Sequence, residues 1–350
     1  MKAETLTEAE PELIEAATAP REPRIKVFTP SELRSYNPAQ EPVLVGDNHV
    51  TRGEVFVIGG EPGVGKSRLA VSLAIAGATG NDWLGLTVRH QFRTLILQTE
   101  NGRYRLKNDF DEIARDGLDD WLRISEPPPF GLTFNNPEFQ DDLATIIADF
   151  KPHVVLLDPW NAVAKDDRQR DYAETFDIIR AILPKGDDKP ALGIVAHTRK
   201  PQTGERRNGG TSLMHTLSGS YVLTSVPRCI WIVVRGSEDE TDQSVVVFNP
   251  KNSNGQNSPR RAWVRKNGLF EPLDGFDWKQ FDKPPAERKI IRPEDIKEVL
   301  EGKGTITKAT AAESLMAITE MGKSACYDAF KAAGKFGHLF AVTAQGITWR

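Results

Sequence analysis

Residues 60–67 read Gly60-Glu61-Pro62-Gly63-Val64-Gly65-Lys66-Ser67, a complete G-x-x-x-x-G-K-[ST] motif. An apolar run at 55–58 precedes the motif and another at 69–74 follows it, so we expect it between a strand and a helix. Glycines let the backbone wrap a phosphate because no Cβ blocks the approach. N–H groups at a helix N-terminus then face the anion. The motif therefore predicts a phosphate-binding loop.

The predicted ligand is ATP with Mg²⁺. Lys66 is placed to reach the β- and γ-phosphates, and the Ser67 hydroxyl is placed to reach the metal. The nucleotide-binding residues that we predict are the eight residues of the loop and Arg68.

The composition limits the other possibilities. The 350-residue chain has a net charge of −4, which excludes a broad basic surface but leaves room for a local nucleic-acid groove. Cys229 and Cys326 are far apart and lack metal-ligand spacing, which favours a reducing compartment. No stretch of eighteen apolar residues and no apolar signal core occur. We expect a cytoplasmic protein without a membrane partner.

Strands and helices alternate after residue 53, which predicts an α/β fold with a mostly parallel sheet covered on both faces. The expected strands are 55–58, 94–98, 154–157 and 192–196, and the expected helices are 67–78, 103–114, 137–150 and 172–183. Three closely spaced strands at 229–235, 244–248 and 261–264 follow without helices. We expect them to extend the sheet in antiparallel fashion.

The chain is predicted to divide into four parts. Residues 1–40 form a tail, whose first two dozen residues are rich in Glu, Ala and Pro, 41–270 form the ATPase core, and 271–290 form a linker. Residues 291–350 contain three helical stretches, at 293–300, 308–316 and 322–333, and two strands, at 338–343 and 347–349. That order predicts a small C-terminal winged helix with a helix-turn-helix, which could contact DNA or protein.

Three more polar residues follow predicted strands of the core. Asp158 ends the apolar run 154–157 and could hold Mg²⁺, although a buried strand can also end in an ordinary surface Asp. Glu100 follows the strand after the phosphate loop and could orient and deprotonate the attacking water, or simply favour a helix start. His197 ends a further strand and could hydrogen-bond the γ-phosphate.

This layout resembles the RecA-type ATPases, most closely the RepA-type hexameric replicative helicases of plasmids and mobile elements. The resemblance covers residues 40–270. It implies that Lys66, Glu100, Asp158 and His197 are catalytic. The segment 218–223, with Arg228 after it, looks like the family's G-S-x-V-L segment and its arginine finger. The sequence Lys251-Asn252-Ser253-Asn254-Gly255 looks like the family's Lys-x-Asn-Tyr-Gly turn without its tyrosine, which implies that Lys251 contacts nucleotide.

An arginine finger has a physical reason. The γ-phosphoryl group carries charge in the transition state, and a neighbouring subunit can supply a guanidinium that forks onto its oxygens. We therefore expect a homo-oligomer, in particular a hexameric ring, with ATP at each interface. As an alternative, Arg228 is a solubilising charge at a strand edge.

Two loops are predicted to contact single-stranded DNA in the ring channel. One follows Asp158 and the other follows His197, and repetition around a ring would make them a basic lining. The C-terminal helices could add duplex contacts. The predicted DNA-binding residues are Lys165, Arg168, Arg199, Lys200, Arg206, Arg207, Lys323 and Lys331.

The sequence favours an ATP-driven ring helicase that translocates on single-stranded DNA. A filament-forming recombination or repair ATPase is a second interpretation. An ATP-switched DNA-binding regulator or loader, which reads a site through the winged helix, is a third. Unwinding of a forked duplex would favour the helicase, and strand exchange would favour the recombination ATPase. Specific duplex binding without unwinding would favour the regulator.

Overall fold

The computed structural model describes residues 25–113, 115–163, 169–199, 211–217, 221–237, 239, 241–282 and 290–350. Its centre is a nine-stranded sheet with the order β11-β10-β9-β8-β3-β7-β6-β4-β5. The strands of this sheet are β3 (Val55–Gly60), β4 (Thr94–Gln98), β5 (Leu122–Ile124), β6 (Val154–Asp158), β7 (Ala191–His197), β8 (Cys229–Arg235), β9 (Ser244–Asn252), β10 (Arg261–Lys266) and β11 (Leu269–Pro272).

The six strands from β8 to β5 run parallel, and β9, β10 and β11 add antiparallel pairs at one edge. Every residue of β3, β4 and β6 is buried, as expected for strands covered on both faces. The predicted fold class, a mostly parallel sheet with an antiparallel extension, is confirmed. The parallel strands bring their carboxyl ends to one edge, where ligands bind in such sheets.

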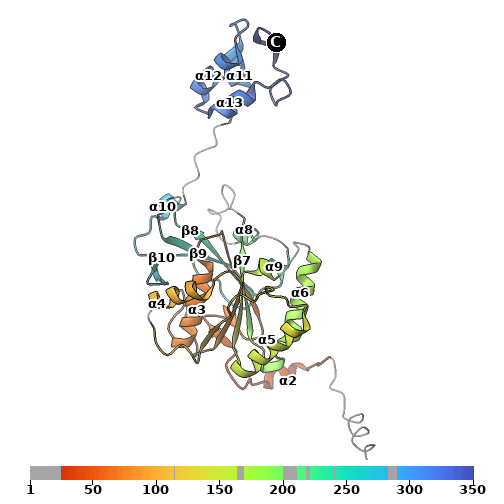
Figure 1. The fold of residues 1–350 in the computed structure, drawn as a ribbon, viewed down its shortest axis with the longest axis vertical. Helices are drawn as coiled ribbons and strands as arrows, with labels where there is room; N and C mark the ends of the chain where they lie inside the picture. Colours follow the sequence, from red (N-terminus) through yellow and green to blue (C-terminus); the bar gives the residue numbers. More distant parts are fainter. Residues whose placement is uncertain are drawn as a thin grey trace, which may run out of the picture.

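Helices cover both faces of the sheet, with α3 and α4 on one side and α5 and α6 on the other (Figure 1). Each face packs into its own apolar cluster, one centred on Leu69, Leu73 and Trp231, the other containing Trp160 and Phe176. The helices of the core are α2 (Pro30–Ser35), α3 (Lys66–Thr79), α4 (Arg103–Ile113), α5 (Pro137–Phe150), α6 (Gln169–Ile182), α8 (Thr211–Met214), α9 (Val222–Ser225) and α10 (Trp278–Phe281), together with the 3₁₀ turns Trp160–Ala162 and Gly186–Asp188. None of the described helices is long and apolar enough to cross a membrane.

The core continues beyond residue 270, where we expected a linker to begin. β11 ends at Pro272, and Phe276, Trp278 and Phe281 pack against the core cluster. Arg260 holds this segment with two hydrogen bonds of 2.7 Å to the Asp282 carboxylate and lies 4.5 Å from the centre of the Trp278 ring. Residues 283–289 of the predicted linker lie outside the described residues.

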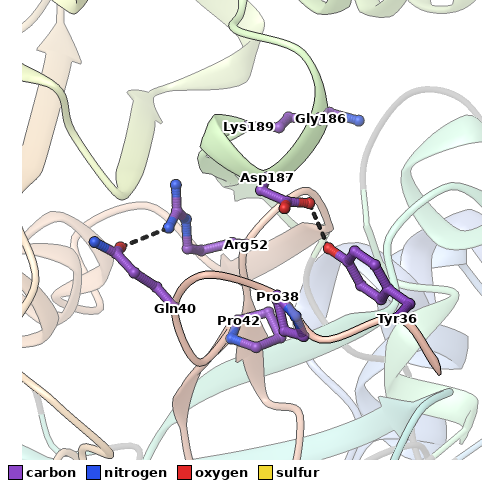
Figure 2. A pocket seen from close by; sticks show the side chains of 8 residues that line it. All are labelled: Tyr36, Pro38, Gln40, Pro42, Arg52, Gly186, Asp187 and Lys189. Atoms are coloured by element: carbon purple, nitrogen blue, oxygen red, sulfur yellow. Dashed lines mark hydrogen bonds between the residues drawn. The ribbon is translucent and has the colours of Figure 1, made fainter.

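The segment before the core is fastened to the amino edge of the sheet. Thr29 begins α2 with a capping box to Glu32, and a small hairpin follows, β1 (Val43–Val45) with β2 (Val50–Thr51). Residues 36–42 close a pocket of about 160 Å³, in which the Tyr36 hydroxyl donates to Asp187 and Arg52 donates to Gln40 (Figure 2). Of the predicted tail, residues 1–24 lie outside the described residues.

Residues 290–350 have an apolar core of their own, which includes Ile296, Leu315, Phe330 and Ile347. The elements are α11 (Pro293–Leu300), α12 (Lys308–Thr319), α13 (Lys323–Ala329) and an antiparallel hairpin of β12 (Phe340–Thr343) and β13 (Gly346–Trp349). Three helices followed by a hairpin were predicted here, and the winged-helix interpretation of them stays a prediction.

Candidate nucleotide site

The phosphate loop connects β3 to α3 at the carboxyl edge of the sheet. Gly65 caps α3 with φ 100°, a conformation that side chains with a Cβ rarely adopt. At Gly60 a Cβ would lie 2.7 Å from the carbonyl oxygen of Val233, so the two strands approach too closely for any other residue. The two glycines shape the turn, and the first turn of α3 then presents its N–H groups.

Lys66 is buried, with 6% of its surface exposed, and two contacts fix its ammonium group. Its Nζ donates to the carbonyl of Glu61 at 2.9 Å and lies 3.3 Å from Nδ1 of His197. Burial lowers the pKa of Lys66 to about 8, against opposing effects from Asp158, Glu100 and Glu61. A triphosphate in the loop would supply the anion that this ammonium lacks.

His197 ends β7 directly beside Gly60, its partner in the parallel pair β3–β7. Burial, and then Lys66, lower the pKa of His197. Because an ammonium can only donate, Nδ1 accepts from Lys66 and Nε2 carries the proton. The imidazole can therefore offer one N–H to a phosphate oxygen.

Asp158 and Ser67 form the part of the site that suits Mg²⁺. Asp158 ends β6, is 6% exposed, and hydrogen-bonds the Ser67 side chain. Burial raises the pKa of Asp158 to about 6. No group of three or more His, Cys, Asp or Glu side chains that could hold a metal occurs in the described residues. One carboxylate and one hydroxyl fit Mg²⁺, which takes its remaining ligands from phosphates and water.

Glu100 lies on an exposed turn after β4, within electrostatic reach of Lys66, Asp158 and His197. Four of the five predicted catalytic residues, Lys66, Glu100, Asp158 and His197, converge at the carboxyl edge of the sheet. The fifth, Arg228, lies at the other edge.

Gln98, whose role the sequence did not reveal, holds the Glu100 turn. Its buried side chain accepts from the backbone N–H groups of Glu100 and Asn101 at 3.1 and 2.7 Å. It donates to the carbonyls of Asn101 and Ser125 at 2.8 and 2.7 Å. A polar residue inside an otherwise apolar strand, Leu95-Ile96-Leu97-Gln98, was the available signal.

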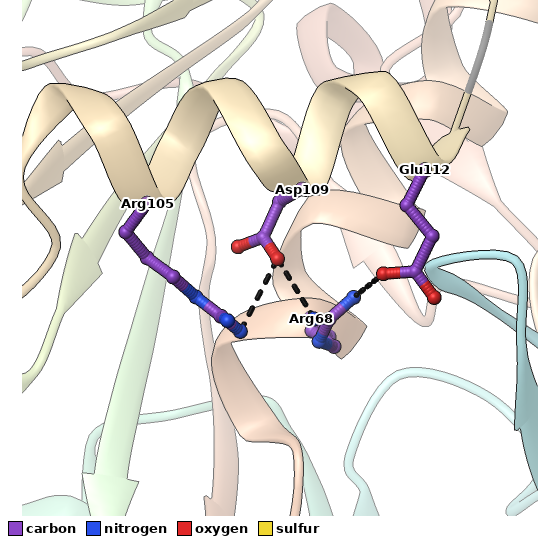
Figure 3. A network of polar contacts seen from close by, with 4 residues as sticks. All are labelled: Arg68, Arg105, Asp109 and Glu112. Carbon is purple, nitrogen blue, oxygen red and sulfur yellow. Dashed lines mark hydrogen bonds and ion pairs between the residues drawn. The ribbon is translucent and has the colours of Figure 1, made fainter.

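Arg68 forms ion pairs with two carboxylates of α4 (Figure 3). Its guanidinium lies 2.7 Å from Asp109 and 3.1 Å from Glu112, and Arg105 reaches the same Asp109 oxygen at 3.2 Å. These contacts tie the start of α3 to the helix that follows Glu100. The predicted contact of Arg68 with nucleotide stays a prediction, and its ion pairs favour a structural role.

Arg228 and Lys251 lie together at the opposite, amino edge of the sheet. The Arg228 N–H donates to the carbonyl of Val55 at 2.8 Å, and Lys251 lies in β9 opposite Ile230. Gly60 is five residues further along β3, which corresponds to roughly 17 Å. The Arg228 guanidinium pairs with Glu54 at 3.5 Å, and Lys251 Nζ donates to the carbonyl of Thr224 at 2.8 Å. Neither side chain belongs to the phosphate loop of this chain.

An aromatic ring that the sequence did not reveal lies beside the phosphate loop. Phe270 of β11 packs so close to Gly65 that a Cβ there would lie 3.3 Å from the ring. The β10–β11 turn also meets α4, because the Gly268 N–H bonds the Glu112 carboxylate. The antiparallel edge therefore borders the nucleotide site.

Most of the predicted DNA-binding residues lie outside the described residues, namely Lys165, Arg168, Lys200, Arg206 and Arg207. Arg199 is exposed, and its N–H donates to the carbonyl of Thr216 at 2.9 Å. Lys323 begins α13 and Lys331 follows its end, although the predicted helix extended further, and Lys331 pairs with Asp328 at 2.8 Å. Both lysines are exposed.

The sequence pattern of the AAA_25 family, described as "AAA domain", matches residues 19–203. That match covers more than half of the chain and contains the phosphate loop, Glu100, Asp158 and His197. The chain belongs to this AAA-domain family. These are RecA-like P-loop ATPases, so ATP binding and an ATPase core follow for this AAA-domain protein. Arg228 and Lys251 lie beyond the matched region.

A similar solved structure is the crystal structure of the KaiC-like protein PH0186 from Pyrococcus horikoshii OT3. It is 10% identical, with a TM-score of 0.46, and the alignment covers 67% of this chain and 99% of that chain. No curated protein matches the sequence significantly.

Proposed function

We propose that this protein is a ring-forming, DNA-stimulated ATPase, with Mg²⁺ bound by Ser67 and Asp158 and Glu100 as general base. The best candidate within that class is a hexameric DNA helicase, related to the RepA-type replicative helicases of plasmids and mobile elements. His197 would sense the γ-phosphate.

The observation that carries the proposal is the separation of Arg228 and Lys251 from the phosphate loop of their own subunit. Both cations lie towards the amino edge of the sheet. By the strand rise, Arg228, level with Val55, is roughly 17 Å from Gly60 along β3, and Lys251, whose partner Ile230 pairs with Val57, is roughly 10 Å from it. The γ-phosphate needs a cation besides Lys66 in the transition state. Arg235 at the end of β8 lies near the loop, with one guanidinium nitrogen 3.7 Å from the position that a Cβ on Gly63 would take, so Arg228 of a neighbouring subunit would add to a cation from the same chain. A second copy of the chain can supply Arg228, and subunits that complete each other's sites head to tail form a ring where the rotation closes and a filament where it does not.

The DNA part of the proposal rests on the basic loops after β6 and β7. Replacing Arg206 and Arg207 with alanine is expected to abolish stimulation of ATP turnover by single-stranded DNA and to leave basal turnover intact. Binding to single strands should also lose salt dependence, because fewer counterions are released. The matched control is Arg34→Ala with Arg265→Ala, which removes the same charge from two exposed positions.

Unwinding of a forked duplex by the wild type, with loss in the loop variant, would support the helicase. If the loop variant retains full stimulation, these loops are not the DNA contact.

A second function is favoured by the separate core of the C-terminal helices and hairpin. An ATP-switched regulator or loader would use this part to hold duplex DNA or a partner. Deleting residues 287–350 should leave basal turnover and single-strand stimulation intact if the ring motor is right. Loss of DNA stimulation in the truncation alone would favour the regulator, whereas strand exchange activity would favour a recombination ATPase.

A further inference from the structure

The amino edge of the sheet carries a second cluster of cations, far from the phosphate loop. A cavity of about 650 Å³ opens there, a size typical of small-molecule sites. Its lining is mostly basic, polar or aromatic, and consists of Gln40, Glu41, Arg89, His90, Gln91, Arg93, Asp120, Trp121 and His153.

Three of the lining residues are held by the start of the parallel sheet. Arg93, Trp121 and His153 each stand one residue before a strand of the parallel sheet, β4, β5 and β6. The backbone joins them, since the Thr94 N–H donates to Trp121 and the His153 N–H donates to Arg93, at 2.8 and 2.9 Å. The Arg93 N–H in turn donates to His153 Nδ1 at 3.1 Å. The parallel register therefore fixes the three residues side by side.

The cations of this cluster are poorly neutralised. In the described part of the chain, neither Arg89 nor Arg93 forms an ion pair with a carboxylate, although Glu41 and Asp120 also line the cavity. Arg89 donates to the carbonyl of Gly46 at 3.2 Å. Nε of Arg93 and Nε2 of His90 are buried and lack a hydrogen-bond partner among the described residues.

The charges that act on His153 are all positive. Burial, followed by Arg52, Arg93 and His90, lowers the pKa of His153 to about 4. A half-buried arginine without a counter-ion is costly, because it loses hydration without gaining an anion. An anion in the cavity would remove that cost.

We propose that this cavity binds a phosphate group, carried either by a small free anion or by a nucleic-acid strand. Arg89 and Arg93 would donate charge-assisted hydrogen bonds to its oxygens, and arginine suits phosphate because its N–H groups form a fork. This site is distinct from the phosphate loop, which lies at the other edge of the sheet. It does not depend on the proposed motor function.

The test uses the full-length chain with Mg²⁺ and a non-hydrolysable ATP analogue, so that the phosphate loop is already filled. Inorganic phosphate is titrated, and the His153 ring resonance, assigned with His153→Gln, is followed by NMR. Arg93→Gln and, separately, Arg89→Gln should each weaken phosphate binding by about tenfold or more. Arg89 is exposed, so Arg89→Gln keeps the test valid should Arg93→Gln fail to fold.

The matched control is Arg123→Gln. This arginine lies in β5, two residues from Trp121, but already pairs with Asp149 at 2.7 Å. It should leave phosphate binding unchanged. In a second arm, fluorescence anisotropy measures binding of an oligothymidylate. A parallel loss in that arm assigns the phosphate to a nucleic-acid strand, and no loss there assigns it to a free anion. The proposal is overturned if phosphate leaves the His153 resonance unmoved, or if both variants bind phosphate as the wild type does.

Discussion

Lys66→Met removes the ammonium group from the phosphate loop and keeps the volume of the side chain. Burial lowers the pKa of Lys66 from 10.5 to about 8. One pKa unit corresponds to 1.36 kcal/mol, so the folded protein without nucleotide bears a cost of about 3 kcal/mol at pH 7 for keeping this lysine charged. The variant should therefore be more stable than the wild type by about 2–3 kcal/mol at pH 7, while ATP turnover is abolished.

The sign of the pH dependence follows from the direction of the shift. A depressed lysine pKa favours the folded state at high pH, and this contribution is lost as the pH falls through the folded value of about 8. The advantage of Lys66→Met should therefore be full at pH 7 and shrink towards zero near pH 10.5.

Urea unfolding of nucleotide-free protein at several pH values measures the difference. A variant that is less stable than wild type at pH 7, or a difference that does not change with pH, would refute the reasoning. Ordinary ATP turnover in the variant would remove the phosphate-loop assignment itself.

Three further outcomes are expected at the same site. Glu100→Gln should keep ATP binding but lose hydrolysis on the order of 10²-fold or more, because an amide cannot act as a base; turnover near wild type would place the base elsewhere. Gln98→Leu should lower kcat much more than it changes the affinity for ATP, because the turn that carries Glu100 loses its side-chain hydrogen bonds; an unchanged kcat in folded protein would exclude the positioning role. The pH profile of kcat/KM should fall below about pH 6, where Asp158 is protonated, and above about pH 8, where Lys66 loses its charge; a profile that stays flat from pH 5 to 9 would contradict these assignments.

The sequence predicted most of the parallel sheet because its strands are continuous apolar runs between helices. Cys229–Arg235 and Pro137–Phe150 have the bounds that were predicted for them. β5 was missed because it has only three residues, of which one is buried. β11 was missed because Leu269–Pro272 is short, ends in proline and lies where composition suggested a linker.

The residues of the site also divide into those that a local sequence pattern predicts and those that only the folded sheet brings together. Lys66 was found through the phosphate-loop motif, and Asp158 and His197 were found because each ends a recognisable strand at the carboxyl edge. Phe270 could not be found in this way, because only the antiparallel register brings β11 back to Gly65. The adjacency of Arg228 and Lys251 likewise depends on the pairing of β8 with β9, which no local pattern encodes.

Mixing two inactive variants tests the shared site most directly. Arg228→Ala lacks the proposed finger but keeps the base, and Glu100→Gln keeps the finger but lacks the base. In mixed particles, an interface that joins Arg228 of one subunit to Glu100 of its neighbour is intact, so ATP turnover should recover above that of either variant alone. Absence of recovery at every mixing ratio, in particles shown to contain both variants, would contradict an active site shared between subunits.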